Sequence, residues 1–324
     1  MKFLYLTDTH IRGRRPWTRK DNFAATLASK LQEVVELAND YGVTAVLHGG
    51  DFFDLPAPAL PTVGQFAAIL RQLRAPLYVV PGNHDIYGYD PASLEHTMLG
   101  FLARLGLLHL LVPEVKRYFR RRNLTVQVTG QPFHYAIDCR DPQKDYCVAK
   151  TGCDLAIHLV HGMLVPKPFY SGAPYTLIEQ VAPYTQADYT LASHAHFGFP
   201  EVFYQGKWFI NPGSLARLSA HPKDIERFPQ VVLLDFSGPV PRHSYIRLQS
   251  ARPGHEVIDT GAFEANLRRQ ARLREHLTRI HQEGPVSLQD LLDALGAKKK
   301  VPGYVQTEAR KRLRKAVRLE KRLR

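Results

Sequence analysis

The segment LYVVPGNHD, residues 77–85, sets an amide, an imidazole and a carboxylate directly after a short apolar run. Proline and glycine are enough to end a strand in a turn, so the turn itself does not require Asn83, His84 or Asp85. Functional residues of α/β folds gather at the carboxyl ends of strands. The segment therefore predicts a chemical site at the end of this strand, to which other strands contribute.

Short apolar runs alternate with helical patterns as far as residue 236, which predicts an α/β fold with a largely buried sheet or sheets. The predicted strands are Phe3–Leu6, Val43–Leu47, Leu77–Val80, Leu124–Val128, Leu155–Val160, Tyr189–Ala192, Trp208–Ile210 and Val231–Phe236. Helices are predicted between Asp21 as cap and Gly42 as stop, over residues 60–73 and over residues 91–105. Fewer helices separate the runs after Leu124, so we expect the second sheet to be more antiparallel.

Five of these runs end in side chains of a kind that binds metal ions. These are Asp8 and His10, Asp51, Asn83, His161, and His194 with His196. In Asp-x-His and His-x-His an extended chain places both side chains on one side, so each pair can address one centre. Oxygen and imidazole ligands without a thiolate suit Mn²⁺, Fe or Zn²⁺. Seven ligands are too many for one ion, but they suffice for two ions that share a carboxylate.

A close pair of metal ions is suited to the hydrolysis of phosphate esters. One ion can lower the pKa of a bridging water to give hydroxide, and both can neutralise charge on the phosphoryl oxygens. The leaving alkoxide still needs a proton from a histidine that is not a ligand. We therefore expect Asn83 to bind metal, His84 to act as general acid, and Asp85 to orient or tune the imidazole of His84.

The motifs DTH (8–10), GGDFFD (49–54), GNHD (82–85), HG (161–162), HAH (194–196) and NPGS (211–214) follow in this order. In order and spacing they resemble the calcineurin-like metallophosphoesterase superfamily over about residues 1–236. The resemblance implies a four-layer α/β/β/α sandwich of two mixed sheets, followed here by a small basic, mainly helical C-terminal region.

The resemblance also implies how the ligands are shared. One ion would take Asp8, His10, Asp51 and His196, and the other Asp51, Asn83, His161 and His194, with Asp51 bridging. Two positions depart from the family pattern. Ser193 stands where the family usually has glycine before His-x-His, and His48 precedes Gly-Gly-Asp, where we expect it to support ligands without being one.

TDTHIRG, GGDFFDLPAP, PGNHD and VTGQPFHY are most similar to the DNA-repair nucleases of the SbcD type, bacterial relatives of the eukaryotic meiotic-recombination nuclease. This resemblance implies a manganese-dependent DNA exo- and endonuclease in repair or recombination. It also implies a homodimer and a partner, an SbcC-type coiled-coil ATPase. A cytoplasmic, nucleoid-associated protein is the corresponding expectation.

The net charge of +13 is concentrated near the C-terminus. Residues 263–324 hold 17 Lys and Arg against 7 Asp and Glu, a net of +10. Such a region suggests a polyanion or an acidic partner, although a solvated helix face would have the same composition. The predicted organisation is a nuclease domain over 1–238, a strand-like linker or small cap over 239–262, and a basic helical region over 263–324 that binds DNA or the ATPase.

Contacts to substrate and partner are predicted outside the metal centre. Three guanidinium groups and an indole follow His10 closely, and they suit phosphates and a base, although a solvated loop would also explain them. These residues are Arg12, Arg14, Arg15 and Trp17, and His134 is predicted as a further substrate contact. An amphipathic helix over 303–324 presents Val305, Ala309, Leu313, Ala316 and Leu323 to the partner.

Composition excludes several other classes of protein. No apolar run approaches the roughly 18 residues that a membrane helix needs, and the start lacks the apolar stretch of a signal peptide. Cys139, Cys147 and Cys153 are odd in number and match no zinc spacing, which favours a reduced cytoplasm.

Two alternatives to the nuclease remain open at the level of sequence. A phosphoesterase for a phosphoprotein, a cyclic nucleotide or a lipid pyrophosphate would use the same metal chemistry, but it has no evident need for the basic C-terminal region. A non-catalytic DNA-binding or assembly subunit would keep the ligands for folding, but the retention of His84 beside a full ligand set argues against it.

Overall fold

The computed structural model describes residues 1–113, 115–168 and 172–261, together with 268–269, 292–293, 296, 301–311 and 313 of the C-terminal region. The chain divides into two compact units, Met1–Thr260 and Gly261–Arg324. Among the described residues, no helix combines the length and the apolar character needed to cross a bilayer.

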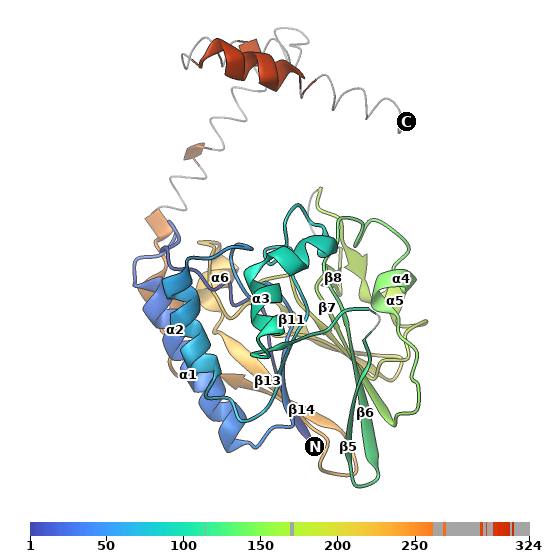
Figure 1. Cartoon of the computed structure of the whole chain (residues 1–324). Helices are drawn as coiled ribbons and strands as arrows, with labels where there is room; N and C mark the ends of the chain where they lie inside the picture. The colour runs from blue at the N-terminus through green and yellow to red at the C-terminus, as the bar shows by residue number, and fades with distance from the viewer. Residues whose placement is uncertain are drawn as a thin grey trace. The chain divides into compact units, whose positions relative to one another are not determined.

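Two six-stranded sheets form the first unit (Figure 1). The first has the order β14-β13-β1-β2-β3-β4: Arg242–Arg247, Gln230–Asp235, Lys2–Leu6, Ala45–His48, Leu77–Val79 and His109–Leu110. The second has the order β11-β12-β10-β7-β6-β5: Phe199–Tyr204, Lys207–Asn211, Tyr189–Ala192, Leu155–Val160, Leu124–Gln131 and Arg117–Arg121. β8 (Leu164–Val165) and β9 (Thr176–Leu177) pair separately.

The helices of the first unit lie between or after these strands in the sequence. They are α1 (Phe23–Asp40), α2 (Leu60–Leu70), the 3₁₀-helix η1 (Pro91–His96), α3 (Met98–Arg104), α4 (Gln143–Tyr146), α5 (Ile178–Val181), α6 (Pro222–Glu226) and α7 (Gly254–Val257). Figure 1 shows α1 and α2 side by side on the first sheet, and α4 and α5 on the second.

The side chains of β1 show why both faces of the first sheet are buried. Leu4 and Leu6 belong to the core beneath the helices, whereas Phe3 and Tyr5 belong to the core between the two sheets. Successive residues of a strand point to opposite faces, so an unbroken apolar run fills both cores. A third core lies on the outer face of the second sheet, where Phe209 meets α4 and α5. The predicted four-layer sandwich of two mixed sheets is confirmed.

The prediction that the second sheet is more antiparallel is wrong. Its central pairs β12–β10, β10–β7 and β7–β6 are parallel, and only the edge strands β11 and β5 pair antiparallel. The first sheet likewise has three parallel pairs, β1–β2, β2–β3 and β3–β4, and two antiparallel ones. Parallel strands need a crossover connection. In the second sheet short helices and the strand β11 form these crossovers, so few long helices appear between the runs.

One predicted helix has a different cap in the structure, and another is divided into two helices. Asn22, not Asp21, caps α1, since its side chain accepts a hydrogen bond from the Ala25 amide at 3.2 Å. Asp21 is bound instead to the Arg19 guanidinium. The helix predicted over 91–105 is divided by Thr97, whose backbone is extended and whose hydroxyl caps α3. Such caps depend on backbone geometry that periodicity does not reveal.

The segment predicted as a strand-like linker or small cap, residues 239–262, contains a strand of the first sheet, β14. β14 pairs with β13 from Gln230↔Arg247 to Asp235↔Arg242 and so completes the edge of the first sheet. Farther on, Val257 and Ile258 are buried. In the C-terminal unit residues 303–311 are helical, and Val305, Ala309 and Leu313 are described. Ala316 and Leu323 lie outside the described residues, so the partner-binding face remains a prediction.

The pKa of His158 provides a test of how deeply the second sheet is buried. It lies on β7 with Nδ1 2.9 Å from the Thr129 hydroxyl, and burial lowers its pKa to about 4 from 6.5. Between these values the unfolded chain binds more protons than the folded one, so stability falls as pH decreases. Between pH 7 and pH 5, wild type should lose about 2 kcal/mol more unfolding free energy than His158→Gln. Urea unfolding at both pH values measures this, and parallel losses in the two proteins would contradict it.

Candidate metal centre

The predicted ligands come together where strands of both sheets end. β1, β2 and β3 of the first sheet lead to the segments of Asp8, Asp51 and Asn83, and β7 and β10 of the second lead to those of His161 and His194. In each of three groups of described residues, the potential ligand atoms lie within 4.8 Å of one another. Two groups contain the predicted ligands, namely Asp8, His10, Asp51 and His196, and Asp51, His161 and His194, and the third is His10, Asp54 and His84. Asp51 belongs to the first two groups.

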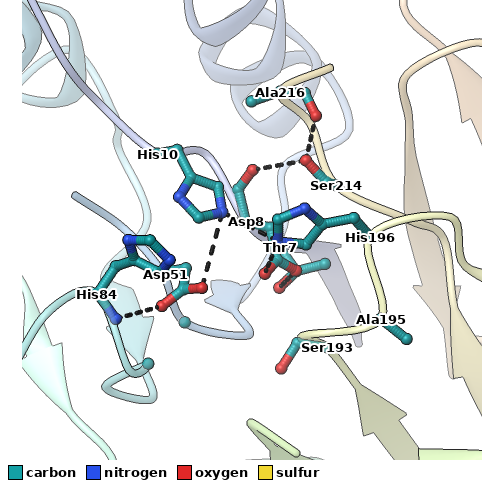
Figure 2. Close-up of polar contacts among 12 residues, drawn as sticks. Thr7, Asp8, His10, Asp51, His84, Ser193, Ala195, His196, Ser214 and Ala216 are labelled. Atoms are coloured by element: carbon teal, nitrogen blue, oxygen red, sulfur yellow. Dashed lines mark hydrogen bonds and ion pairs between the residues drawn. The ribbon is translucent and has the colours of Figure 1, made fainter. Parts of the chain in front are cut away.

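The first group surrounds the Asp51 carboxylate and the His10 imidazole (Figure 2). His10 Nε2 lies 3.1 Å from His196 Nε2 and 3.6 Å from Asp51 Oδ2. His196 Nε2 lies 3.5 Å from Asp8 Oδ1. Nitrogen and oxygen atoms from three separate segments thus converge on one point.

The second group lies on the other side of Asp51. His161 Nε2 is 3.4 Å from Asp51 Oδ2 and 3.1 Å from the Asn83 side-chain oxygen. The His194 ring is 5.1 Å from the His161 ring between centroids. All the residues of the predicted ligand set are therefore within or next to one of the two groups.

Four buried polar atoms of this centre have no hydrogen-bond partner among the described residues. They are Asp8 Oδ1, His10 Nδ1, Asp51 Oδ2 and His194 Nδ1. An unsatisfied buried polar group costs about 1–3 kcal/mol, so such atoms are rare without a reason. Carboxylate oxygen and imidazole nitrogen accept a cation where no donor is present. The donor set fits two divalent metal ions that share Asp51.

The surroundings of Asp51 favour the metal-binding protonation state at Asp51 and His194 but not at His161. Burial would raise the pKa of Asp51, but His161 and His10 hold it well below its ordinary value. Burial lowers the pKa of His194 to about 3, and the nearby His161 contributes, so His194 is neutral. Burial opposes protonation of His161 as well, yet Asp51 and Asp8 raise its pKa to about 9. Metal and proton therefore compete at His161.

The backbone at four predicted ligands is left-handed, which the extended-chain argument did not foresee. The φ angles are 52° at Asp8, 44° at His10, 48° at Asp51 and 68° at His194. Residues other than glycine rarely adopt this region, at a cost of about 1–3 kcal/mol each, and such positions cluster at functional sites. The Asp8 and His10 amides donate to the Gly50 and Asp51 carbonyls at 3.0 and 2.9 Å, which stabilises this conformation.

Two glycines of the motifs allow the close approach of these segments. A Cβ on Gly82 would lie 2.2 Å from the Asp51 amide nitrogen, and one on Gly50 would lie 2.3 Å from His161 Nδ1. Real side chains do not come this close, so the GGD and GNHD motifs need glycine for steric reasons.

The two departures from the family pattern both have structural explanations. The Ser193 hydroxyl donates to the Gly49 carbonyl at 2.6 Å, and His161 Nδ1 contacts the same oxygen at 2.9 Å. Serine therefore adds a link between the two sheets at the metal centre. His48 accepts from the Gly50 amide at 3.1 Å and contacts the Thr9 hydroxyl at 3.1 Å. It supports both motif loops, as expected.

His84 stands beside the first group, but the predicted contact from Asp85 to its imidazole is wrong. His84 Nδ1 lies 2.9 Å from the Asp54 carbonyl oxygen, and its backbone amide donates to Asp51 Oδ1 at 2.8 Å (Figure 2). The Asp85 carboxylate accepts instead from the backbone amides of Phe52, Phe53 and Gly82. Asp85 is adjacent to His84 in sequence, which suggested a contact between the two side chains. The Asp85 carboxylate instead holds the GNHD loop against the GGDFFD loop.

Asp54 is the residue of the site that sequence reasoning missed. Its carbonyl binds His84, while its carboxylate lies 3.6 Å from His10 Nδ1 and 2.9 Å from Arg12 Nη1. It thus connects a ligand, the predicted acid and a predicted phosphate contact. The spacing Asp51-x-x-Asp54 within GGDFFD was the available signal.

The other predicted substrate contacts lie apart from the metal ligands. Arg14, Arg15 and Trp17 are exposed, and Arg15 donates to the Lys20 carbonyl at 3.3 Å. The His134 imidazole pairs with a carboxylate outside the predicted ligand set, since its Nε2 lies 2.9 Å from Asp145 Oδ1.

Buried cations hold the loop of residues 214–217 behind Asp8, which sequence reasoning also missed. The Ser214 hydroxyl donates to the Asp8 carbonyl at 3.1 Å (Figure 2). Arg227 donates to the Ser214 and Ala216 carbonyls, and Lys30 Nζ donates to that of Leu215. Burial lowers the pKa of Lys30 well below its ordinary value. The Ser214 and Ala216 carbonyls receive charge-assisted hydrogen bonds from Arg227, which are stronger than neutral ones.

The fold and the donor set define a metal-dependent phosphoesterase. The chain belongs to the calcineurin-like phosphoesterase family, whose model matches residues 1–211. The resemblance inferred from the motifs is confirmed.

Relatives include the DNA double-strand break repair protein Mre11 of Halobacterium salinarum, 27% identical over 235 residues, which are 69% of this chain and 54% of the relative. The Mre11 protein of Methanosarcina acetivorans is 23% identical over 301 residues, or 86% of this chain and 44% of the relative. The chain spans about half the length of these relatives. The calcineurin-like phosphoesterase YfkN from Bacillus subtilis aligns with a TM-score of 0.46 at 15% identity, over 76% of this chain and 90% of the other.

Replacement of the shared carboxylate tests the metal centre without reference to activity. Mn²⁺ at about 100 times its Kd should stabilise wild type by about 2.7 kcal/mol per site. Asp51→Asn should lose most of this effect, because it removes a charge shared by both groups. Calorimetric melting with and without MnCl₂ gives the comparison. Asp40→Asn, an exposed change at the end of α1, is the matched control, and equal stabilisation of all three proteins would contradict the assignment.

Proposed function

We propose that the protein is a DNA nuclease of the SbcD type that hydrolyses phosphodiesters with two divalent cations, Mn²⁺ in the first place. The observation that carries this proposal is the position of His84. It lies next to two groups of ligand atoms that share Asp51, yet its Nδ1 is bound to a carbonyl. A histidine fixed in this way can serve the reaction without binding metal.

Different side chains would bind the metal ions, donate the proton and contact the phosphate. Asp8, His10, Asp51 and His196 would hold one cation, and Asp51, Asn83, His161 and His194 the other. When bound, the cations supply Lewis-acid charge and an activated water. In the protonated His84 imidazole, Nδ1–H donates to the Asp54 carbonyl, which orients the ring. Nε2–H is then the group that protonates the leaving oxygen. Asp54 holds Arg12 at 2.9 Å, where its guanidinium can meet a phosphate.

Three observations support DNA as the substrate. Relatives of this chain are DNA double-strand break repair proteins. Arg12, Arg14, Arg15 and Trp17 follow a predicted ligand within a short segment. Residues 263–324 carry a net charge of +10 from their 17 basic and 7 acidic residues. Basic surfaces bind nucleic acid through its phosphates.

The proposed partners follow from the resemblance to the SbcD-type nucleases. An SbcC-type coiled-coil ATPase would bind the basic C-terminal region, with Val305, Ala309 and Leu313 on the described part of the contact face. A homodimer is the proposed assembly.

Removal of the proposed acid separates catalysis from metal binding. His84→Ala should lower kcat on DNA by about 10²–10⁴-fold, the usual contribution of a general acid, with two metal ions still bound per chain. Nuclease assays with Mn²⁺, Mg²⁺ and Zn²⁺ and metal analysis provide both readouts. His96→Ala changes an exposed histidine of η1 and serves as control.

Two results would count against the proposal. Loss of metal from His84→Ala would make this residue a ligand and not the acid. A wild-type protein that cleaves small phosphomonoesters but leaves all forms of DNA intact would reject the nuclease.

A further inference from the structure

A second concave site lies between η1 and the segment that follows β6. Its cavity of about 680 Å³ is bordered by Pro91 of η1, by Pro81 and Pro132, and by Tyr135, Arg140 and Lys144. This volume is within the usual range for pockets that hold a small organic molecule. The walls are largely apolar and the cations lie together in one segment, so an occupant with an apolar ring and an anionic group would fit.

The charge of the lining residues limits the kinds of ligand that the cavity can bind. Arg140 and Lys144 both border the cavity, and no aspartate or glutamate is among its described lining residues. The nearby buried Asp145 carboxylate is already occupied, since it accepts from Arg140 Nε at 2.9 Å and contacts His134 Nε2 at 2.9 Å. Because Arg140 is paired with Asp145, Lys144 supplies the remaining positive charge, and a lining without a carboxylate of its own disfavours a metal ion and favours phosphate.

An exposed aromatic ring accompanies these cations. The Tyr135 side chain is 80% exposed, although it belongs to an ordered turn in which His134 Nδ1 accepts from the Ala136 amide at 3.2 Å. An aromatic ring exposed beside basic side chains is the arrangement on which bases of single-stranded nucleic acids stack.

The cavity lies close to the metal centre along the chain and through packing. Pro81 immediately precedes the GNHD motif, and its carbonyl accepts from the Phe133 amide at 3.0 Å. The Phe133 ring is 5.4 Å from the ring of His194, a predicted ligand, and 5.4 Å from the exposed ring of Tyr89. Phe133 thus belongs to the segment that borders the cavity, and its ring contacts a predicted metal ligand.

We propose that this cavity binds a nucleotide of the DNA strand that flanks the phosphodiester at the metal centre, with its base on Tyr135 and its phosphate at Lys144 and Arg140. The inference rests on the proposed nuclease function and extends it to a strand-binding subsite. Recognition is by stacking and charge, so an unpaired strand of any sequence would be accepted. His134 contributes by holding the Tyr135 turn against Asp145, and not by touching metal or scissile phosphate.

Four variants test the subsite. Tyr135→Ala removes the stacking ring, and Tyr135→Phe keeps it. Lys144→Glu reverses a charge on an exposed side chain of α4, and Arg71→Glu makes the same charge change beyond the last residue of α2. All three positions are exposed, so the four variants should fold.

Binding is measured by fluorescence anisotropy with a labelled single strand of about 10 nucleotides in EDTA, at several salt concentrations. Tyr135→Ala should weaken binding about tenfold, and Tyr135→Phe should stay close to wild type. Lys144→Glu should weaken binding more than Arg71→Glu does, and should reduce the slope of log Kd against log salt by about one. With Mn²⁺, all variants should hydrolyse bis(p-nitrophenyl) phosphate at the wild-type rate.

The outcomes separate this inference from the function on which it rests. If wild type cleaves DNA but Tyr135→Ala and Lys144→Glu bind the strand like Tyr135→Phe and Arg71→Glu, the subsite is refuted and the nuclease stands. If Tyr135→Ala also slows hydrolysis of the small ester, the ring acts on the metal centre and the subsite is again refuted. If wild type neither binds nor cleaves DNA, both proposals fall.

Discussion

The Asp51 carboxylate is the element on which the whole site depends. Its Oδ2 lies 3.6 Å from His10 Nε2 and 3.4 Å from His161 Nε2, and its Oδ1 accepts from the His84 amide at 2.8 Å. A single buried carboxylate thus joins both ligand groups and the segment of the proposed acid. Its charge is balanced by His10, which follows a strand of the first sheet, and by His161, which follows a strand of the second. The site therefore exists only while the two sheets keep their relative position.

This arrangement requires a scaffold that resists relaxation. Four ligand residues have left-handed backbones, and several acceptors face one another without donors. Hydrogen bonds between distant segments oppose the resulting strain. Ser193 and His161 both contact the Gly49 carbonyl, and Arg227 and Lys30 hold the loop that supports Asp8. A strained site stabilised by rigid surroundings is the usual compromise between stability and function.

Local patterns were sufficient to predict the central strands and the convergence of the ligands, whereas the four layers followed from the family resemblance. An apolar run that ends in Asp-x-His reports both a strand and its functional end. The features that sequence reasoning missed depend on backbone geometry or on contacts between residues far apart in the sequence. Asp54 acts on His84 through a carbonyl, which side-chain chemistry does not reveal. Lys30 meets Leu215 across 185 residues, and β14 is recognisable only by its pairing with β13.

The most direct test of the account is the anomalous scattering of crystals soaked in MnCl₂. The account predicts two manganese peaks about 3.5–4 Å apart, one on each side of the Asp51 carboxylate. A single peak, or peaks remote from Asp51, would contradict the shared carboxylate and with it the proposed chemistry.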